Sequence, residues 1–230
     1  METLAHDPFS TKGAEYLLVL AFLVLLPIYS RYLGGAPLLA PSRVLARQRR
    51  LLSGWFRQPE AAYYHPGHTW AMQTAPGRIR IGVDDFAQKL LGKAQAIALP
   101  EIGARLAKGE PGWSLDVDAH RFDLPAPVTG CVVARNEAAL DDPDMINDDP
   151  YGKGWLLEMA VPAWRPGLRT LLHGNRAKEW LVRAENALRL RMIPEVGAVL
   201  QDGGVPVPGI ARALATDDWD ELARDLLFRE

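Results

Sequence analysis

The chain has 230 residues and a mass of 25.4 kDa, the size of one domain with appendages. Hydrophobic residues make up 48% and charged residues 23%, which are ordinary globular values and exclude both wholesale disorder and a polytopic membrane protein. The 26 lysines and arginines against 28 acidic residues leave a net charge of −2, without the basic excess with which nucleic-acid binders neutralise phosphates. A single cysteine, Cys131, excludes an intrachain disulfide and a Cys-rich zinc site.

An apolar run follows the short N-terminal leader, residues 1–15. Between Tyr16 and Tyr29 the chain has no charged or amide side chain, and a mildly polar extension reaches Leu33. At about 1.5 Å per residue, a helix over 16–33 would be about 27 Å long, close to the roughly 30 Å of bilayer hydrocarbon. The sequence therefore predicts an uncleaved transmembrane helix over residues 16–33, with a buried core helix as the alternative.

A basic juxtamembrane linker, residues 34–62, follows the predicted span and sets its orientation. Arginines accumulate there with no acidic residue before Glu60, whereas Lys12 is the only lysine or arginine ahead of the span. The positive-inside rule then predicts a single-pass membrane protein with its C-terminal domain in the cytoplasm. The arginines either only fix this topology or also contact anionic lipid headgroups. The candidates for such contacts are Arg43, Arg47, Arg49, Arg50 and Trp55.

Short apolar or alternating runs, separated by Gly and Pro turns, follow the linker, as in an all-β sandwich or barrel. The predicted strands are residues 69–73, 78–83, 94–99, 113–117, 131–135 and 155–161. A short helix is expected over 84–91, with Asp84 or Asp85 as its N-cap and Gly92 at its end. Apolar residues at helical spacing predict two further helices, over 175–191 and 217–228.

Three sequence blocks stand out for their length and their order along the chain. They are YHPGHTW (64–70), IGVDDFAQKLLGKAQAIALPEIG (81–103) and NEAALDDPDMINDDPYGKGWL (136–156). Together they resemble the H protein of the glycine cleavage system, a lipoyl carrier. The resemblance implies a mainly β (α+β) fold, the lipoyl-type barrel-sandwich hybrid with flanking helices, here preceded by the transmembrane helix. It places an H-protein-like lipoyl-type domain at 63–185, followed by a C-terminal extension with a terminal helix at 186–230.

In the family that these blocks resemble, lipoate is attached to a lysine at the tip of a β-hairpin, within a Glu-Ser-Val-Lys-Ala motif. A gap-free alignment of residues 108–130 with the family pattern places Asp116 on that glutamate and Ala119 on that lysine. Alanine has no amine to acylate, and the hairpin contains no lysine. The sequence therefore predicts a degenerate lipoyl position and no bound cofactor.

Metal and catalytic sites are not expected. His65 and His68 would face opposite sides of a strand, and with His120 they lack a cysteine or a nearby carboxylate to complete a ligand set, so His68 is interpreted as a packing residue. The acidic run at 141–149 lacks the spacing of a calcium loop and is interpreted as a solvated turn. Cys131 lies in a predicted strand and is interpreted as a small buried hydrophobic residue.

These observations predict a non-enzymatic, membrane-anchored adapter or accessory subunit, whose partners are the lipid bilayer and protein subunits of an unidentified membrane complex. The hairpin tip supplies the interface candidates His120, Arg121 and Phe122. Phe122 is expected to be exposed, with an inward-facing ring as the alternative. A second hypothesis is a carrier that remains in glycine cleavage with help from a modified residue or a partner's arm. A third is a membrane-fusion adapter of an efflux or secretion system.

Overall fold

The computed structural model describes residues 16–22, 25, 54–192 and 207–228. The chain divides into two units, residues 1–51 and residues 52–230. In the first unit, residues 16–22 are helical and their side chains are exposed. Within the described ranges, no helix is both long and apolar enough to cross a membrane. Most of the predicted span at 16–33 lies outside these ranges, as do Arg43, Arg47, Arg49 and Arg50.

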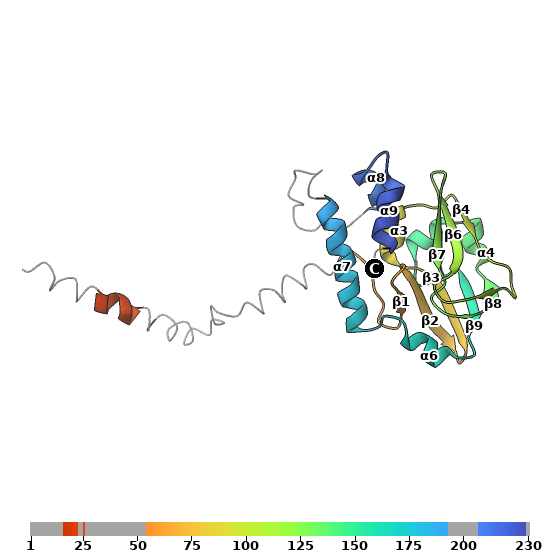
Figure 1. The fold of residues 1–230 in the computed structure, drawn as a ribbon, viewed down its shortest axis with the longest axis horizontal. Helices are drawn as coiled ribbons and strands as arrows, with labels where there is room; N and C mark the ends of the chain where they lie inside the picture. Colours follow the sequence, from red (N-terminus) through yellow and green to blue (C-terminus); the bar gives the residue numbers. More distant parts are fainter. Residues whose placement is uncertain (1–15, 23–24, 26–53, 193–206, 229–230) are drawn as a thin grey trace, which may run out of the picture. The chain divides into compact units, whose positions relative to one another are not determined.

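Two antiparallel sheets form the centre of the second unit (Figure 1). The larger sheet has the order β1-β2-β3-β9-β8-β5, with strands Tyr63–His65 (β1), Thr69–Ala75 (β2), Arg78–Val83 (β3), Leu157–Ala160 (β9), Gly130–Arg135 (β8) and Arg105–Leu106 (β5). The smaller sheet has the order β4-β6-β7, with strands Ala96–Ala98 (β4), Pro111–Val117 (β6) and His120–Pro125 (β7). All six predicted strands are confirmed, several with shifted bounds, and β1, β5 and β7 are additional.

Seven helices flank these sheets in the part of the second unit that the structure describes. They are Asp85–Leu91 (α3), Glu137–Asp141 (α4), Asp144–Asp148 (α5), Trp164–Arg169 (α6), Asn175–Met192 (α7), Ile210–Leu214 (α8) and Trp219–Phe228 (α9). The three predicted helices are confirmed as α3, α7 and α9. The interpretation of the acidic run at 141–149 as a solvated turn is wrong, because most of this run belongs to α4 and α5. The expected boundary between residues 185 and 186 falls inside α7.

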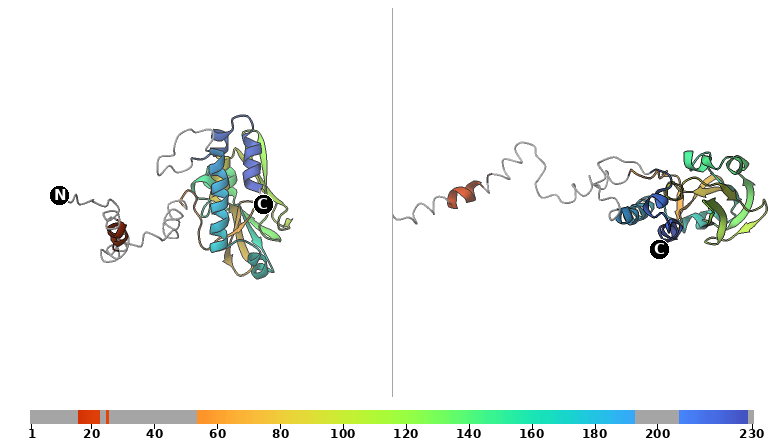
Figure 2. Two further views of the ribbon diagram at one scale, coloured as in Figure 1. Left: turned by 60° about the vertical axis from the view of Figure 1, so that its left-hand side comes forward. Right: turned by 90° about the horizontal axis from the view of Figure 1, so that it is seen from above.

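Side-chain alternation divides the strands between core and solvent. In β3, Ile79 and Ile81 are buried whereas Arg78 is exposed, as a two-residue repeat requires. The main core lies between the sheets and continues into α3 and α9. A second cluster joins α7 to β1 and β2 through Ala177 and Trp70, and Figure 2 shows α7 running along that side of the unit.

Local hydrogen bonds define the ends of α3. Asp84 is the N-cap, and its carboxylate accepts a hydrogen bond from the Ala87 backbone N–H at 2.8 Å, as expected from the sequence. The helix ends at Gly92, which has a positive φ of 84°. The Asp84 carboxylate also lies 2.8 Å from Nδ1 of buried His68, whose ring stacks on Phe86. The interpretation of His68 as a packing residue is confirmed.

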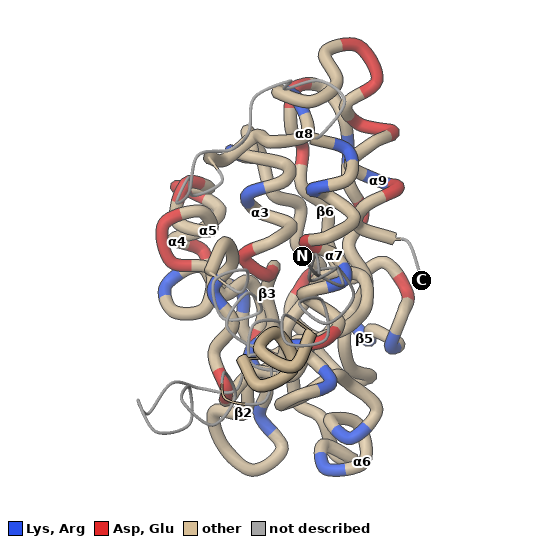
Figure 3. The backbone as a smooth tube through the Cα atoms, turned by 90° about the vertical axis from the view of Figure 1, so that its left-hand side faces the viewer, with Lys and Arg blue, Asp and Glu red and all other residues tan. Residues whose placement is uncertain are grey.

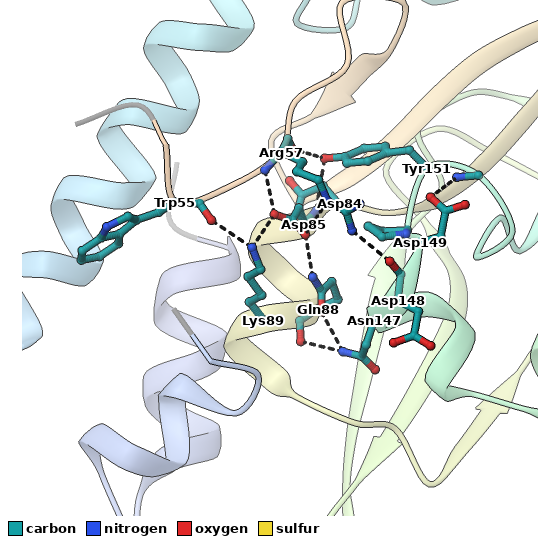
Figure 4. Close-up of polar contacts among 12 residues, drawn as sticks. Trp55, Arg57, Asp84, Asp85, Gln88, Lys89, Asn147, Asp148, Asp149 and Tyr151 are labelled. Atoms are coloured by element: carbon teal, nitrogen blue, oxygen red, sulfur yellow. Dashed lines mark hydrogen bonds and ion pairs between the residues drawn. The ribbon is translucent and has the colours of Figure 1, made fainter. Parts of the chain in front are cut away.

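Buried Asp85 anchors the segment that leads into this unit (Figure 4). Its carboxylate accepts hydrogen bonds from the Arg57 backbone N–H at 2.7 Å, from Lys89 Nζ at 2.8 Å and from Gln88 Nε2 at 2.7 Å. Lys89 Nζ also donates to the carbonyl oxygen of Trp55 at 2.9 Å. The contacts around this one carboxylate therefore hold the chain before β1 against α3.

The position of Trp55 differs from the one expected at a lipid surface. Its side chain is half-buried against the main core, and the Arg189 guanidinium of α7 lies 4.1 Å from the centroid of the indole. This distance is typical of a cation–π contact. Trp55 therefore packs within the second unit.

Candidate functional site at the β6–β7 hairpin

The β6–β7 hairpin ends in a two-residue turn formed by Asp118 and Ala119. Both have positive φ angles, 48° and 65°, and the flanking residues Val117 and His120 are paired. Positive φ at both central residues is the signature of a type I′ turn. Asp118 and Ala119 are exposed. The residue that the resemblance places on the lipoyl position therefore lies at the hairpin tip, with a methyl side chain and no amine.

Both C-terminal helices contact this tip through charged side chains. Arg212 of α8 pairs with Asp118, and Asp220 of α9 lies 3.2 Å from His120 Nδ1. A hydrogen bond from Arg224 holds the pKa of Asp220 below its ordinary value. The helices thus hold the residues on either side of Ala119.

Phe122 lies in the core. It is 1% exposed, and its ring centroid is 5.5 Å from that of Trp219. The expectation of an exposed Phe122 is wrong, and the inward-facing alternative is confirmed. The two-residue repeat of β7 explains the difference, because it turns Phe122 and Leu124 to the same buried face.

The other two interface candidates differ in accessibility. His120 is half-buried, with its ring centroid 5.2 Å from that of Trp219. Arg121 is exposed, and its Nε and Nη2 donate to Ser114 Oγ at 2.9 and 2.6 Å. The Arg121 carbonyl oxygen accepts a hydrogen bond from Arg224 at 3.2 Å. Of the three candidates, Arg121 presents the largest share of its side chain to solvent, 59% against 40% for His120.

A cleft of about 360 Å³ opens beside the hairpin, between the β1–β2 turn and the end of α9. Nδ1 of His65 accepts a hydrogen bond from the Gly67 backbone N–H at 3.0 Å, so the proton of the neutral ring resides on Nε2. Burial lowers the pKa of His65 to about 4, with a further contribution from the charge of Lys108. The cleft is thus lined by the His65 imidazole and by Asp123, together with Pro66, Pro111 and Pro125.

Cys131 is less buried than expected. It is half-buried on β8, and its Sγ donates to the Gly103 carbonyl oxygen at 3.2 Å. In the described ranges, no group of three or more His, Cys, Asp or Glu side chains is placed to hold a metal ion.

Residues 62–184, just over half of the chain, match the family model described as Glycine cleavage H-protein. The chain belongs to this family. The resemblance carried by the three sequence blocks is thereby confirmed at the level of the H-protein family. The match ends within α7, so α8 and α9 lie beyond it.

Individual members of the H-protein family show the same relationship. The glycine cleavage system H protein of Mycolicibacterium smegmatis is 38% identical over 105 residues, which cover 46% of this chain and 80% of the relative. That of Mycobacterium leprae is 39% identical over 128 residues, covering 54% of this chain and 97% of the relative. A crystal structure of the H protein of Mycobacterium marinum is 34% identical, covers 45% of this chain and 86% of that chain, and superposes with a TM-score of 0.43.

These findings correct the predicted localisation. The proteins that this chain matches are glycine cleavage H proteins. The prediction of a single-pass membrane protein with a cytoplasmic C-terminal domain is therefore wrong. Membership of the H-protein family lends no support to the hypothesis of a membrane-fusion adapter.

Proposed function

We propose that the chain is a non-enzymatic accessory protein with the H-protein fold, which docks to protein partners and carries no lipoate on its hairpin. The observation that carries this proposal is Ala119, which occupies an exposed turn at the hairpin tip but has no amine. Attachment of lipoate requires a lysine Nζ to form the amide bond. No lysine lies between Lys108 and Lys153 in the sequence.

Lys108 is a poor substitute for a lysine at the tip. It precedes β6, at the base of the hairpin, whereas Ala119 follows β6 at the tip. Its Nζ donates to the carbonyl oxygen and to Oγ1 of Thr170, at 3.2 and 2.8 Å. Burial lowers the pKa of Lys108. This amine is therefore held by the segment after α6 and does not replace the missing acceptor.

A carrier within the glycine cleavage system is the second candidate. The family match and the names of the relatives favour it. In this function the chain would need lipoate on a lysine outside the hairpin, or an arm supplied by a partner. Both candidates are non-enzymatic, in keeping with the carrier role that the resemblance implies for the family.

A replacement assay separates the two functions. The assay uses a glycine cleavage system reconstituted from Mycolicibacterium smegmatis proteins. This chain, purified from its native host, takes the place of the H protein in that system. We expect glycine turnover no higher than in a sample without any H protein, because no arm can carry the intermediate. The relative's own H protein is the positive control.

Turnover above the blank would overturn the accessory role and support the carrier. Docking is tested separately, by affinity purification of the full chain from its native host. Failure to recover any protein partner would contradict the docking part of the proposal.

A further inference from the structure

We propose that α8 and α9 form a clamp, residues 209–228, which closes one flank of the β6–β7 hairpin to protein partners. The clamp lies beyond the family match, which ends at residue 184. The proposal goes beyond the missing lysine, because it concerns access to the hairpin whatever residue occupies the tip.

Two contacts between acidic and basic side chains join the clamp to the residues beside Ala119. In one the acid belongs to the hairpin, and in the other it belongs to the clamp. The acid on the hairpin, Asp118, pairs with Arg212 of the clamp, and the base on the hairpin, His120, lies 3.2 Å from Asp220 of the clamp. Both signs of charge occur along the clamp (Figure 3). Because the hairpin and the clamp each supply one acidic and one basic side chain, a shifted register would bring the carboxylates of Asp118 and Asp220 together, and the contact favours one arrangement.

Aromatic contacts lie beneath these two contacts. The indole of Trp219 is 5% exposed and packs against the rings of both His120 and Phe122, with centroids 5.2 and 5.5 Å away. The Arg224 guanidinium lies 5.0 Å from the Phe122 ring centroid and donates to the Arg121 carbonyl oxygen. Since β7 is the outer strand of its sheet, this contact covers backbone that an edge strand would otherwise offer to another protein.

The clamp is also anchored on α3, away from the hairpin. The Gly209 backbone N–H donates to the Lys89 carbonyl oxygen at 2.8 Å, and Arg212 Nη2 donates to the Leu91 carbonyl oxygen at 3.2 Å. At Gly92, a Cβ atom would lie 2.7 Å from Arg212 Nη2, so glycine permits this close approach. Figure 2 shows α8 and α9 beside the hairpin strands. Contacts with both α3 and β7 fix the position of the clamp.

This arrangement gives small reagents and macromolecules different access to the hairpin tip. Ala119 remains exposed, so a small molecule reaches the tip from solvent. A protein that must hold the hairpin from both sides meets the clamp along β7, beside His120. The clamp should therefore slow a modifying enzyme while leaving direct chemical modification of the tip unaffected.

The variant Ala119→Lys tests this separation in the full chain. It places an amine in the exposed turn. A small reagent, the N-hydroxysuccinimide ester of acetate, acylates this amine directly. A lipoate–protein ligase instead joins Nζ to the carboxyl carbon of lipoyl adenylate, releasing AMP and a proton. We expect the introduced lysine to be acetylated at a rate comparable to that of other exposed lysines, but to be lipoylated about ten times more slowly than the Mycolicibacterium smegmatis H protein.

Loosening the clamp should restore the enzymatic reaction. Arg212→Ala and Arg224→Ala, added to Ala119→Lys, remove the outer contacts but keep Trp219, and we expect lipoylation to become about five times faster with unchanged acetylation. Glu221→Ala, an exposed change on α9, is the matched control and should leave both rates unchanged. Circular dichroism and thermal unfolding establish that each variant is folded.

If the triple variant does not fold, Asp220→Ala in the Ala119→Lys background removes the contacts of Asp220 with His120 and Arg224 and gives the same comparison. Lipoylation of the Ala119→Lys variant at the rate of the relative would overturn the clamp. So would a slow reaction that none of the folded loosened variants accelerates. Neither outcome bears on whether the native chain carries lipoate, because both concern an introduced lysine.

Discussion

Replacing Phe122 by alanine is expected to lower the free energy of unfolding by about 3–5 kcal/mol. The ring is fully enclosed, with Leu124 on the same face of β7 and Trp219 of α9 packed against it. Its removal leaves a cavity that closely packed neighbours fill only in part. Denaturant unfolding of the full chain, followed by tryptophan fluorescence, measures the loss.

Ile102→Ala is the control for this substitution. Ile102 is 62% exposed, so its truncation should change the free energy of unfolding by no more than about 0.5 kcal/mol. A loss below about 1 kcal/mol for Phe122→Ala would contradict the buried position of the ring. Such a small loss would also contradict the packing of Phe122 against Trp219 of the clamp.

Asp85→Ala should produce the second large effect, a loss of about 3–5 kcal/mol in the free energy of unfolding. Without this carboxylate, Lys89 Nζ loses its acidic partner at a site where its side chain is only 15% exposed. The Arg57 N–H and the Gln88 amide lose an acceptor at the same time. Removing one member of a buried pair costs more than the pair contributes, because the remaining charge is poorly solvated.

Asp144→Ala is the matched control for Asp85→Ala. Asp144 also pairs with a lysine, but the Lys93 side chain is 67% exposed, and such surface pairs contribute about 0–1 kcal/mol. Equal losses for the two variants would contradict the anchoring role of Asp85. A larger loss at Asp85, with increased proteolysis near Arg57, is the expected result.

Elements governed by local pattern were predictable from the sequence. For α3, the capping carboxylate of Asp84, the apolar face and the terminal Gly92 all lie within one short segment. The buried positions Ala177 and Leu188 of α7 likewise follow helical spacing within a single helix. Short β5 offers too few residues for a periodic signal, since it has only Arg105 and Leu106.

The hairpin shows where prediction from the sequence stops. The resemblance correctly predicts Ala119 at the tip, because a long motif fixes the register on both sides of it. The inward direction of Phe122 follows from its alternation with Leu124, although an aromatic residue near a hairpin tip is also typical of an interface. The covering of the hairpin by Trp219 and Arg224 depends on contacts between segments far apart in the chain. The amphipathic pattern of α9 predicts a packed helix without naming the surface on which it packs.

The intact mass of the full chain, purified from its native host, tests the central claim most directly. The claim is that an H-protein hairpin with Ala119 at its tip carries no lipoate. The predicted result is a mass accounted for by the polypeptide alone, with no signal from an anti-lipoate antibody. A lipoyl adduct on any of the six lysines, located by peptide mapping, would contradict it and identify the chain as a carrier.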